Sequence, residues 1–494
     1  MKILLVNPPV PVTYYNREYY IPLSSVYLAA ALRAHGEEIE ILDMNVIDIG
    51  DVEDARVAHD ERLLDTISRF GPDLIGLTCL FSGNFPDTHR YSIKCKERFP
   101  DIPIIVGGIH FTIHAKQILE NCPTFDWIAM SEAEDTIIDF VEAFKSGRSA
   151  DYSHIDGLSY RHEGGIIIRH KKNFIQDCDT IPFPAYDSVN ISDYYVDTSH
   201  WHNPKQLEFG TSIPLITSRS CPMKCTFCSM FLAMGPKWRA RTPKHVVDEI
   251  ELVYKEYGQN HFSFMDDNFT FNKERTLEIC AEIKKRRLDI QFETPNGVSL
   301  KTLDGEIIDA LVDAGLVRVS LAIESGSELI RNKTMKKYLK SEKIYEVVDA
   351  CKKHKTLYTK AFFIMGMPEE TLETLEQSYE MIKRIDVDRV YVQNIVPFAG
   401  TAVHDQAVED GLLVDLDPTT LYKSDSLFNT NYNRFFVKPY ALSLDDLHVA
   451  RARFNALIEE LQSRRARSAG IQDVDPEKQR KRKASAAVLA GGSL

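Results

Sequence analysis

The chain has 494 residues, of which 44% are hydrophobic and 27% are charged, and it contains 24 glycines and 22 prolines. This composition is that of a globular protein and excludes collagen-like, coiled-coil and wholly disordered chains. The 59 lysines and arginines are outnumbered by 72 aspartates and glutamates, and the net charge of −13 argues against a general nucleic-acid binder. No apolar run is long enough to span a membrane, and the first residues do not resemble a signal peptide. We therefore expect a cytoplasmic protein with no membrane span and no nucleic-acid partner.

Residues 1–148 alternate short apolar runs with segments of helical spacing, which is typical of a parallel sheet covered by helices on both faces. This order predicts an α/β fold with a Rossmann-like first domain, whose ligand lies at the carboxyl ends of the strands. The expected strands are residues 2–9, 38–45, 73–80, 102–108 and 127–134.

Residues 149–210 are expected to be a linker, because a hairpin pattern around Glu163 and Gly164 precedes an extended, proline-containing segment. A second alternation fills residues 211–400, and its six strand–helix steps predict a partial (β/α)6 barrel with its active site at the carboxyl ends of the strands. The expected strands are residues 214–220, 261–268, 290–297, 317–325, 357–366 and 389–398.

The pattern weakens after the barrel. Residues 401–465 are expected to form a mixed C-terminal region, and residues 466–494 a disordered basic tail. Basic residues in the tail are compatible with an acidic partner, but a solvated terminus is the favoured interpretation.

The chain has nine cysteines, and three of them, Cys221, Cys225 and Cys228, lie within eight residues in a C-x3-C-x2-C pattern after the first barrel strand. The other six stand singly, which argues against a secreted disulfide framework. A structural zinc site needs four ligands, and the nearest histidine downstream, His245, stands on an expected helix. A 4Fe-4S cluster bound by three cysteines leaves one iron open to an exogenous ligand. We therefore favour an iron–sulfur cluster over zinc or free thiols.

This cysteine spacing, with Phe227 just before the last cysteine, resembles the motif of the radical S-adenosylmethionine (SAM) superfamily. The resemblance implies that Cys221, Cys225 and Cys228 hold a catalytic 4Fe-4S cluster whose open iron binds SAM. It also implies that an external electron donor, such as flavodoxin or ferredoxin, supports cleavage of SAM to a 5′-deoxyadenosyl radical. That radical would abstract a hydrogen atom from the substrate.

Three pairs of residues at the ends of barrel strands resemble the SAM contacts of this superfamily. Either aspartate of the first pair is equally compatible with a turn residue that caps the following helix. Glycine in the third pair would let the backbone approach adenine closely. The pairs are Asp266 and Asp267 for the amino group, Glu324 and Ser325 for the ribose and carboxylate, and Gly366 and Pro368 for adenine.

A Rossmann-like domain ahead of such a barrel resembles the cobalamin-binding class (class B) of the superfamily. Gly107 and Gly108, after the fourth strand, resemble the glycine turn that lets a corrin ring or its nucleotide tail approach. They are also compatible with a plain strand-to-helix turn. The resemblance places Tyr14, Tyr15 and Arg17 near the lower face of the corrin.

Two features depart from common patterns of cobalamin proteins. Residues 131–134 read Ser-Glu-Ala-Glu where relatives commonly carry Gly-Glu-Gly-Glu, so both glycines are replaced. The loop after the first strand has no histidine to serve as a lower cobalt ligand, and His89, after the third strand, is expected to be a surface helix residue.

The two modules together predict a cobalamin-dependent radical SAM methyltransferase that transfers a methyl group from methylcobalamin to an unactivated carbon of a biosynthetic small molecule. An unactivated C–H bond offers no nucleophile for polar transfer from SAM, whereas a substrate radical can take the methyl group. Relatives often build the substrate pocket in the C-terminal region, which assigns that role to residues 401–465. Two alternatives stay open: a cobalamin-dependent cyclase or rearrangement enzyme without net methylation, and a non-catalytic cobalamin- or metal-binding regulator.

Overall fold

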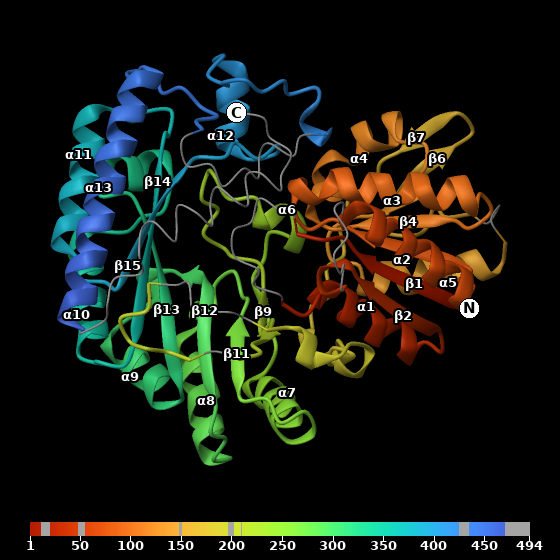
Figure 1. Cartoon of the computed structure of the whole chain (residues 1–494), viewed down its shortest axis with the longest axis horizontal. Coiled ribbons are helices and arrows are strands. Elements are labelled where there is room, and N and C mark those ends of the chain that lie inside the picture. Colours follow the sequence, from red (N-terminus) through yellow and green to blue (C-terminus); the bar gives the residue numbers. More distant parts are fainter. Residues whose placement is uncertain are drawn as a thin grey trace.

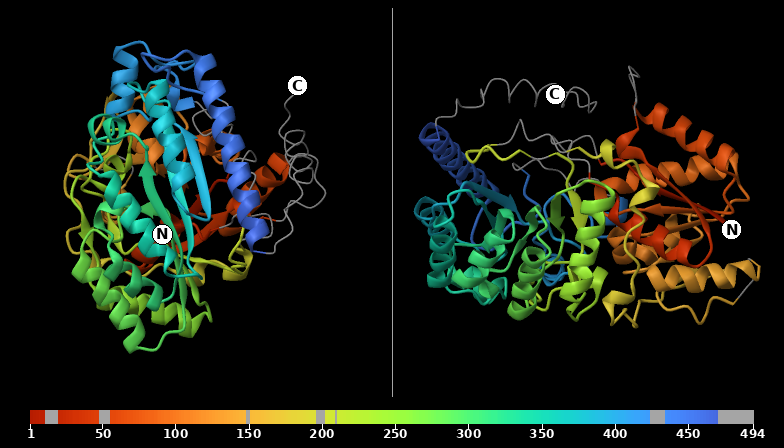
Figure 2. Two further views of the ribbon diagram at one scale, coloured as in Figure 1. Left: turned by 90° about the vertical axis from the view of Figure 1, so that its left-hand side faces the viewer. Right: turned by 90° about the horizontal axis from the view of Figure 1, so that it is seen from below.

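The computed structural model describes residues 1–10, 20–47, 55–147, 151–195, 202–208, 210–423 and 434–469. Figures 1 and 2 show two α/β units side by side, the N-terminal one in red and orange and the second in green and blue. The fold class is therefore confirmed: an N-terminal Rossmann-like sheet, a second parallel sheet, and a helical C-terminal region. No helix in these ranges is both long and apolar enough to cross a bilayer.

The first sheet has the order β2-β1-β3-β4-β5-β6-β7 (Figure 1). Its first five strands are parallel and match the sequence prediction. They are β1 Lys2–Asn7, β2 Glu38–Asp43, β3 Leu74–Thr78, β4 Ile104–Gly107 and β5 Trp127–Ala129. Because these strands are short and apolar and are separated by helices, they pair in parallel and leave their carboxyl ends along one edge.

The hairpin predicted within the linker is present, but it continues the first sheet. Strand β6 (Leu158–His162) pairs antiparallel with β5, and β7 (Gly165–Ile167) pairs with β6. Its turn residues Glu163 and Gly164 have φ angles of 48° and 77°, the left-handed pair that a tight two-residue hairpin turn needs. The first sheet therefore extends into the segment that the sequence pattern assigned to a linker.

Five helices cover the first sheet, and each side has its own apolar core. Helices α2, α3 and α4 pack on one face and α1 and α5 on the other, because their buried residues fall into two separate clusters. The helices are α1 Leu23–Ala34, α2 Ala55–Phe70, α3 Phe85–Arg98, α4 Ile109–Asn121 and α5 Glu134–Lys145.

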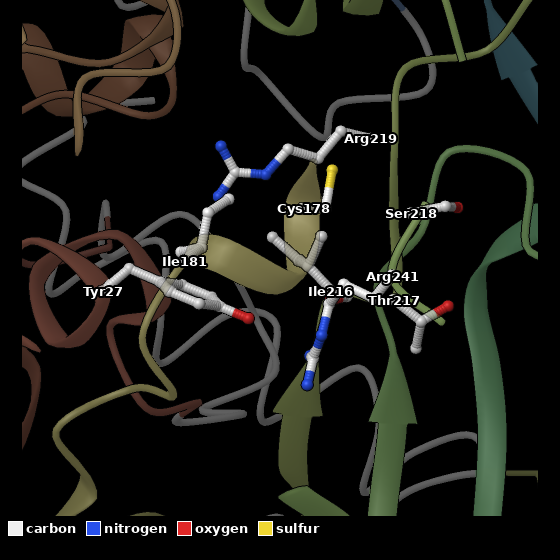
Figure 3. Close-up of a pocket in the computed structure, with 8 residues that line it drawn as sticks. All are labelled: Tyr27, Cys178, Ile181, Ile216, Thr217, Ser218, Arg219 and Arg241. Carbon is white, nitrogen blue, oxygen red and sulfur yellow. The ribbon is translucent and has the colours of Figure 1, made fainter. Parts of the chain in front are cut away.

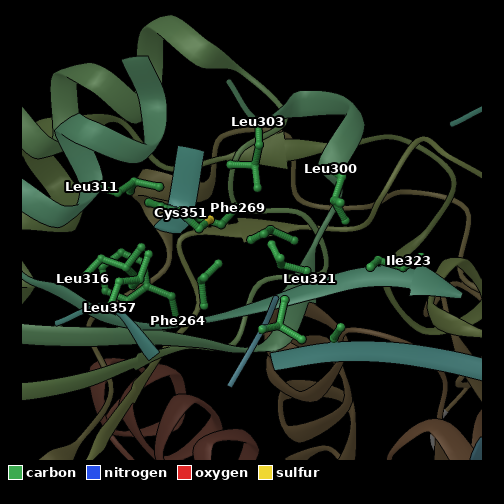
Figure 4. Close-up of a cluster of buried hydrophobic side chains, with 14 of the residues drawn as sticks. Phe264, Phe269, Leu300, Leu303, Leu311, Leu316, Leu321, Ile323, Cys351 and Leu357 are labelled. Carbon is green, nitrogen blue, oxygen red and sulfur yellow. The ribbon is translucent and has the colours of Figure 1, made fainter. Parts of the chain in front are cut away.

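The second sheet is the predicted six-stranded partial barrel, with the parallel order β15-β14-β13-β12-β11-β8. Its strands are β8 Ile213–Leu215, β11 His261–Phe264, β12 Gln291–Val298, β13 Leu316–Glu324, β14 Tyr358–Met365 and β15 Arg389–Asn394. The helices that alternate with them are α7 Pro243–Glu256, α8 Lys273–Lys285, α9 Gly305–Asp313, α10 Ser341–Lys352 and α11 Leu372–Arg384. Figure 4 shows part of the core between strands and helices, with Phe264, Phe269 and Leu321.

Three short elements follow β8 and lie near the first domain. The strands β9 (Ser218–Arg219) and β10 (Arg239–Ala240) pair antiparallel, and the helix α6 (Met230–Met234) lies between them in the chain. Helix α6 contacts α4 of the first domain. The carboxyl edges of the two sheets therefore meet at this place (Figure 1).

The C-terminal region contributes to the core of the barrel. Helix α12 (Ala402–Glu409) follows β15, and the long helix α13 (Leu444–Ser468) packs on α11 and β15. Leu447 and Phe454 of α13 belong to the main buried cluster of the barrel. Helix α13 runs past the predicted start of the tail, and residues 470–494 lie outside the described residues.

Candidate active site

The three clustered cysteines lie on the loop between β9 and α6, at the carboxyl edge of the barrel sheet. Cys221, Cys225 and Cys228 are free thiols and partly exposed. The loop bends at Ser220 and Lys224, whose φ angles of 69° and 49° are left-handed, and the backbone amide of Cys228 donates to the carbonyl of Cys225 at 3.1 Å. The tight loop brings the three thiols near enough to affect one another's pKa.

The electrostatics of these thiols fit a shared cluster. Burial raises the pKa of all three, to about 12 for Cys228, and the neighbouring thiol Cys221 raises the pKa of Cys225 and Cys228 further. Iron must therefore displace protons when it binds. Within the described ranges no three His, Cys, Asp or Glu side chains converge closely enough for one metal ion. A 4Fe-4S cluster does not need such convergence, because each cysteine binds a different iron atom.

A buried amide beside Cys221 also indicates a missing partner. Asn268 is fully buried next to this thiol and lowers its pKa, although burial raises it more. Neither the Nδ2 nor the Oδ1 atom of Asn268 has a conventional hydrogen-bond partner. Because a buried amide whose only neighbouring polar group is a thiol is poorly satisfied, its position next to the cysteines fits a polar group that binds there.

The two aspartates after β11 have different surroundings. Asp266 is 2% exposed and accepts hydrogen bonds from Thr217 N at 3.1 Å and Thr217 Oγ1 at 2.7 Å, and also from the Ser218 hydroxyl. Its carboxylate therefore fixes the turn that leads from β8 to the cysteine loop. Asp267 is partly exposed, and burial together with the charge of Asp266 raises its pKa to about 7. The Ser220 amide, as a hydrogen-bond donor, lowers this pKa in part, and of the pair Asp267 is the more exposed toward a ligand.

Glu324 and Ser325, at the end of β13, also have different surroundings. Glu324 adopts a left-handed φ of 71° and pairs with Lys337 Nζ at 2.8 Å. The Lys337 ammonium also lowers the pKa of Cys225, which places this ion pair at the cysteine loop. Ser325 is fully buried, and its hydroxyl accepts from Ser327 N at 3.1 Å. Ser325 therefore stabilises the loop after β13, whereas Glu324, through its partner Lys337, lies near the cysteine loop.

The segment after β14 is held by a residue that the sequence analysis missed. Gly366 has a left-handed φ of 93°, and its N–H donates to Glu370 Oε2 at 2.5 Å, while Met367 N–H donates to the same oxygen at 3.3 Å. Glu370 is fully buried, and burial raises its pKa to about 8. Pro368 is buried, and its carbonyl accepts from Tyr440 N at 2.9 Å. The sequence signal that could have identified Glu370 was a carboxylate four residues after a glycine at the end of a strand.

Phe227 lies at the boundary between the cysteine loop and the C-terminal region. It packs on a small apolar cluster that includes Ile330 and Met367 of the barrel loops and Val403 of α12. The backbone amide of Val403 donates to the Thr226 carbonyl at 3.1 Å. The C-terminal region is therefore bonded directly to the cysteine loop.

The carboxyl edge of the first sheet carries an apolar surface. Leu80 and Phe81, just after β3, are 54% and 37% exposed. Gly108 has a φ of 105°, and a Cβ atom there would lie 2.5 Å from the Cys79 carbonyl oxygen, so the turn itself requires glycine. At Gly107 a Cβ would meet only ordinary contacts. An exposed apolar edge beside a side-chain-free turn fits the flat face of a corrin.

Two further expectations concern the first domain. Tyr14, Tyr15 and Arg17 lie outside the described residues. His89 lies on α3 as expected, but it is partly buried and packs on Phe85 and Phe125 with ring centroids 5.7 and 5.6 Å apart. His89 is therefore only partly at the surface, because the helix turns one side of its ring toward an aromatic cluster.

The acidic loop after β5 crosses to the barrel. Glu132 accepts hydrogen bonds from Arg219 Nη1 at 2.9 Å and from Arg239 Nη1 at 2.8 and 3.0 Å. Arg219 also donates to Glu134 at 3.1 Å, and the four side chains are between 2% and 11% exposed. Burial would raise the pKa of Glu134, but Arg219 outweighs this and lowers it. Because Arg219 stands two residues before Cys221, this interdomain ionic network ties the first domain to the cysteine loop.

A small cavity also lies at the junction between the first domain, the linker and the barrel. Figure 3 shows its lining, in which Tyr27 of α1 and Cys178 of the linker lie beside residues 216–219 of the barrel. The Arg219 guanidinium lies 5.9 Å from the centre of the Tyr27 ring. On the first domain, the Ser131 hydroxyl donates to the Leu232 carbonyl of α6 at 3.0 Å. The first domain, the linker and the cysteine loop therefore pack as one unit.

Comparisons with known proteins agree with these two modules. The family profile of the radical SAM superfamily matches residues 215–382, and that of the B12 binding domain matches residues 16–141. An uncharacterised methyltransferase of Pyrococcus horikoshii is 29% identical over 461 residues, which cover 90% of this chain and 94% of the relative. Cytidylyl-2-hydroxyethylphosphonate methyltransferase of Streptomyces wedmorensis is 26% identical and aligns over 92% of this chain and 89% of its own length.

A cyclase and a solved structure are also similar. Anaerobic magnesium-protoporphyrin IX monomethyl ester cyclase of Rubrivivax gelatinosus is 26% identical over 84% of this chain and 74% of the relative. The structure of the radical SAM methyltransferase TsrM from Kitasatospora setae, with cobalamin and a 4Fe-4S cluster bound, matches with a TM-score of 0.70 and 19% identity. The match covers 92% of this chain and 89% of that chain and supports the fold.

The barrel, its three-cysteine loop and the matching profile define the chain as a member of the radical SAM superfamily. The first domain makes the assignment more particular: the chain is a B12-binding radical SAM enzyme, whose cofactors are a 4Fe-4S cluster, SAM and cobalamin.

Proposed function

We propose that this enzyme is a methyltransferase that moves a methyl group from cobalamin to an unactivated carbon of a biosynthetic small molecule. The observation that carries the proposal is the interdomain ionic network of Glu132, Glu134, Arg219 and Arg239. It holds the carboxyl edge of the B12 domain against the loop that carries the cluster cysteines. Methyl transfer to a radical requires the two cofactors to face one substrate, and a buried ionic contact supplies that fixed geometry.

The residues around the cysteines have distinct tasks in this proposal. When bound, the cluster and SAM supply a 5′-deoxyadenosyl radical for hydrogen abstraction, and cobalamin supplies the methyl group. Cys221, Cys225 and Cys228 would hold the cluster, and the carboxylates of Asp267 and Glu324 would orient the amino and ribose groups of SAM. Lys337 Nζ lies 2.8 Å from the buried Glu324 carboxylate and holds it in place at the cysteine loop.

Residues of the C-terminal region close the site on another side. Phe227 packs on Val403 and its neighbours, and the Val403 amide is bonded to the Thr226 carbonyl at 3.1 Å. This apolar wall would exclude water from the cysteine loop, and exclusion of water protects a radical from side reactions. We therefore propose that residues 401–465 form part of the substrate pocket.

The test is a balance of products from the anaerobically purified protein. A methyltransferase uses one SAM for the radical and another to remethylate cobalamin, so 5′-deoxyadenosine and S-adenosylhomocysteine should form in step with methylated product. Iron, cobalt and zinc analysis of the same sample checks the cofactors. A preparation that holds zinc in place of iron, or that retains no cobalamin, would overturn the proposal.

The alignment with the Rubrivivax gelatinosus cyclase favours a second candidate, a cobalamin-dependent cyclase or rearrangement enzyme. Such an enzyme would form 5′-deoxyadenosine with its product but no S-adenosylhomocysteine. A non-catalytic regulator, the third possibility from the sequence, would not cleave SAM at all when the reduced protein is supplied with it.

A further inference from the structure

The inner face of the barrel sheet differs in chemistry from the face that the helices cover. Side chains of a strand alternate between the two faces of a sheet. Alternate residues of β13, β14 and β15, among them Leu321, Ala361 and Val390, belong to the main apolar core. Figure 1 shows α9, α10 and α11 on the side of the sheet away from the first domain. The strand residues that intervene between the core residues therefore lie on the opposite, inner face.

The register of the parallel strands arranges the inner side chains in rows. The upper row is Ala322, Phe362 and Tyr391, and the lower row is Ser320, Lys360 and Arg389. Along β13 the upper row lies two residues, and the lower row four residues, before Glu324 at the carboxyl edge. At about 3.3 Å per residue, the lower row is roughly 13 Å from that edge.

The upper row combines two rings with small neighbours. The Phe362 and Tyr391 rings are partly exposed, and their centroids lie 5.6 Å apart. A Cβ atom at Gly297 of β12 would lie 3.5 Å from the Ala322 Cβ atom and 3.8 Å from Phe362 Cδ2. Because glycine and alanine carry at most a methyl group, the face is lower here than at the rings. A flat apolar molecule matches this shape, since aromatic faces favour flat partners.

The lower row is cationic and has two polar atoms that lack a partner within the described ranges. The Nε atom of Arg389 and the Oγ atom of Ser320 are buried and accept or donate no hydrogen bond there. Lys360 stands between these two residues in the register. A buried polar atom without a partner is costly. Arginine pairs with carboxylate or phosphate through two parallel hydrogen bonds, so an anion is the partner that suits this row.

The carboxylate of the inner face is engaged by other groups. Glu293 of β12 is 1% exposed and accepts from Ser263 Oγ at 2.7 Å and from the Arg318 guanidinium. Burial would raise the pKa of Glu293, but the charges of Arg318 and Lys360 lower it. Below the carboxyl edge, the described inner face of β12 to β15 thus carries three cations and one carboxylate. Such a face attracts a further negative charge.

Linker residues lie across the amino end of this face. The Tyr358 hydroxyl donates to the His202 carbonyl at 2.7 Å, and Lys205 Nζ lies 3.7 Å from Asp388. Tyr358 begins β14, and Asp388 directly precedes β15. We therefore expect a ligand to enter from the carboxyl edge, where the cysteine loop lies.

We propose that this inner face binds the substrate, and that the substrate is a flat, apolar molecule with an anionic group, a carboxylate or a phosphate. Arg389 and Lys360 bind the anion, and the rings of Phe362 and Tyr391 pack on the apolar body. A molecule anchored roughly 13 Å from the edge points its far end toward the cysteine loop, which positions that end for hydrogen abstraction. The inference rests on the proposed function, because it assigns this face to the substrate of that reaction.

The test compares three probes that share one flat body: 2-naphthyl phosphate, 2-naphthoate and the neutral 2-naphthamide. Binding is measured by calorimetry on the enzyme with its cluster and cobalamin bound. Wild type should bind the better of the two anions at least about tenfold more tightly than the amide. Preference for the phosphate assigns a phosphorylated substrate, and preference for the naphthoate assigns a carboxylic acid. Equal binding of all three probes, or no binding of either anion, would overturn the inference.

Arg389→Gln removes one charge of the lower row. It should weaken the better anion about tenfold and leave 2-naphthamide within about twofold of wild type. Arg389→Lys keeps the charge and should restore most of the affinity. Lys360→Gln should show the same selective loss, and it tests the row even if the Arg389 variants do not fold. The matched control Arg384→Gln removes an exposed arginine of α11 and should change no binding.

Ala322→Leu tests the upper row, because it fills the low part of the face beside the rings. It should weaken all three probes, the neutral amide included, about tenfold. An equal loss of anionic and neutral probes in Arg389→Gln would show a structural role and overturn the anion site. Equal losses in Arg389→Gln and Arg384→Gln, or no loss in both lower-row variants, would overturn it as well.

The probe measurements need no turnover, so they separate this inference from the proposed function. If the enzyme with both cofactors forms no methylated product, the methyltransferase assignment fails, whereas the preference for anionic probes still decides the role of the inner face. If methylation is found but the anions bind no better than the amide, the substrate class is wrong and the activity stands.

Discussion

Single side chains decide which thiols of this protein can hold a cluster. Cys280 and Cys351 are 2% and 1% exposed in the apolar core of the barrel, whereas the cysteines of the motif stand on a loop and are partly exposed. Buried single thiols behave as small apolar side chains. Chemistry at sulfur is therefore confined to the loop between β9 and α6.

We expect Cys225→Ala to abolish SAM cleavage, because two thiolates do not hold a 4Fe-4S cluster firmly. Iron in the anaerobic preparation should fall well below the value of about four atoms per chain that one such cluster supplies. The matched control Cys280→Ala should keep its iron and lose about 1 kcal/mol of stability from the small cavity. Full iron content in the Cys225 variant would contradict the site.

Glu370 should make the stability of the protein depend on pH. Burial raises its pKa to about 8, and Arg451 and the backbone amides of Gly366 and Met367 counteract this only in part. The folded protein then binds this proton more tightly than the unfolded chain. The contribution is complete below the ordinary glutamate pKa of about 4.3 and is lost as the pH rises through about 8.

The measurement compares thermal unfolding midpoints between about pH 5 and pH 9, a range chosen to bracket the shift. Glu370→Gln, a neutral isostere, should remove part of the decline of the midpoint with pH, an effect of a few kcal/mol at most. Parallel pH curves for wild type and variant would show that Glu370 is ionised throughout. The exposed Glu376→Gln is the control and should leave the curve unchanged.

At the scale of elements, strand ends and the turns after them form the site. The sequence predicted these positions because apolar runs and helical spacing locate each strand within a few residues, and parallel strands share a carboxyl edge. It did not distinguish Asp266 from Asp267, since neighbouring aspartates look alike until the fold turns one toward Thr217. Glu370 was missed because its spacing from Gly366, the one signal in the sequence, does not show that the carboxylate accepts from backbone amides.

The turn from β4 to α4 should tolerate no side chain at Gly108. A Cβ there would lie 2.5 Å from the Cys79 carbonyl oxygen at a φ of 105°. We expect Gly108→Ala to lower the stability by about 2 to 4 kcal/mol, and to weaken cobalamin retention measured by absorbance after gel filtration.

Gly71→Ala is the matched control for this prediction. Gly71 also has a positive φ, 62°, but no atom within 4 Å of its Cβ position. It should cost only about 1 kcal/mol and leave cobalamin retention intact. Equal effects of the two substitutions would show that conformational strain alone, without the clash at Cys79, determines the requirement for glycine.

At the scale of the whole molecule, the interdomain ionic network sets the relation of the two modules. Glu132→Gln would leave Arg219 and Arg239 short of buried negative charge, which costs about 3 kcal/mol or more. We expect the B12 domain to lose its fixed position over the cysteine loop. SAM cleavage should persist while methylation falls, so the ratio of 5′-deoxyadenosine to methylated product should rise.

The control for the network is Glu376→Gln, which removes an exposed pair with Arg453 and should leave that ratio unchanged. A fall of both products in proportion, with the ratio kept, would contradict a positioning role. It would show instead that the network serves general stability.

The sequence by itself determined the two α/β modules and the parallel strands of each in chain order, and it singled out the three clustered cysteines. These features depend on local periodicity and on residue spacing within one loop, and both can be read directly from the sequence. Only the tertiary structure decided that the loop of Glu132 and Glu134 binds arginines of the barrel, and that the backbone of Thr334 and Met335 binds the cysteine loop. Such contacts join residues far apart in the sequence. Burial determines which charged groups must pair, and no local sequence pattern specifies burial.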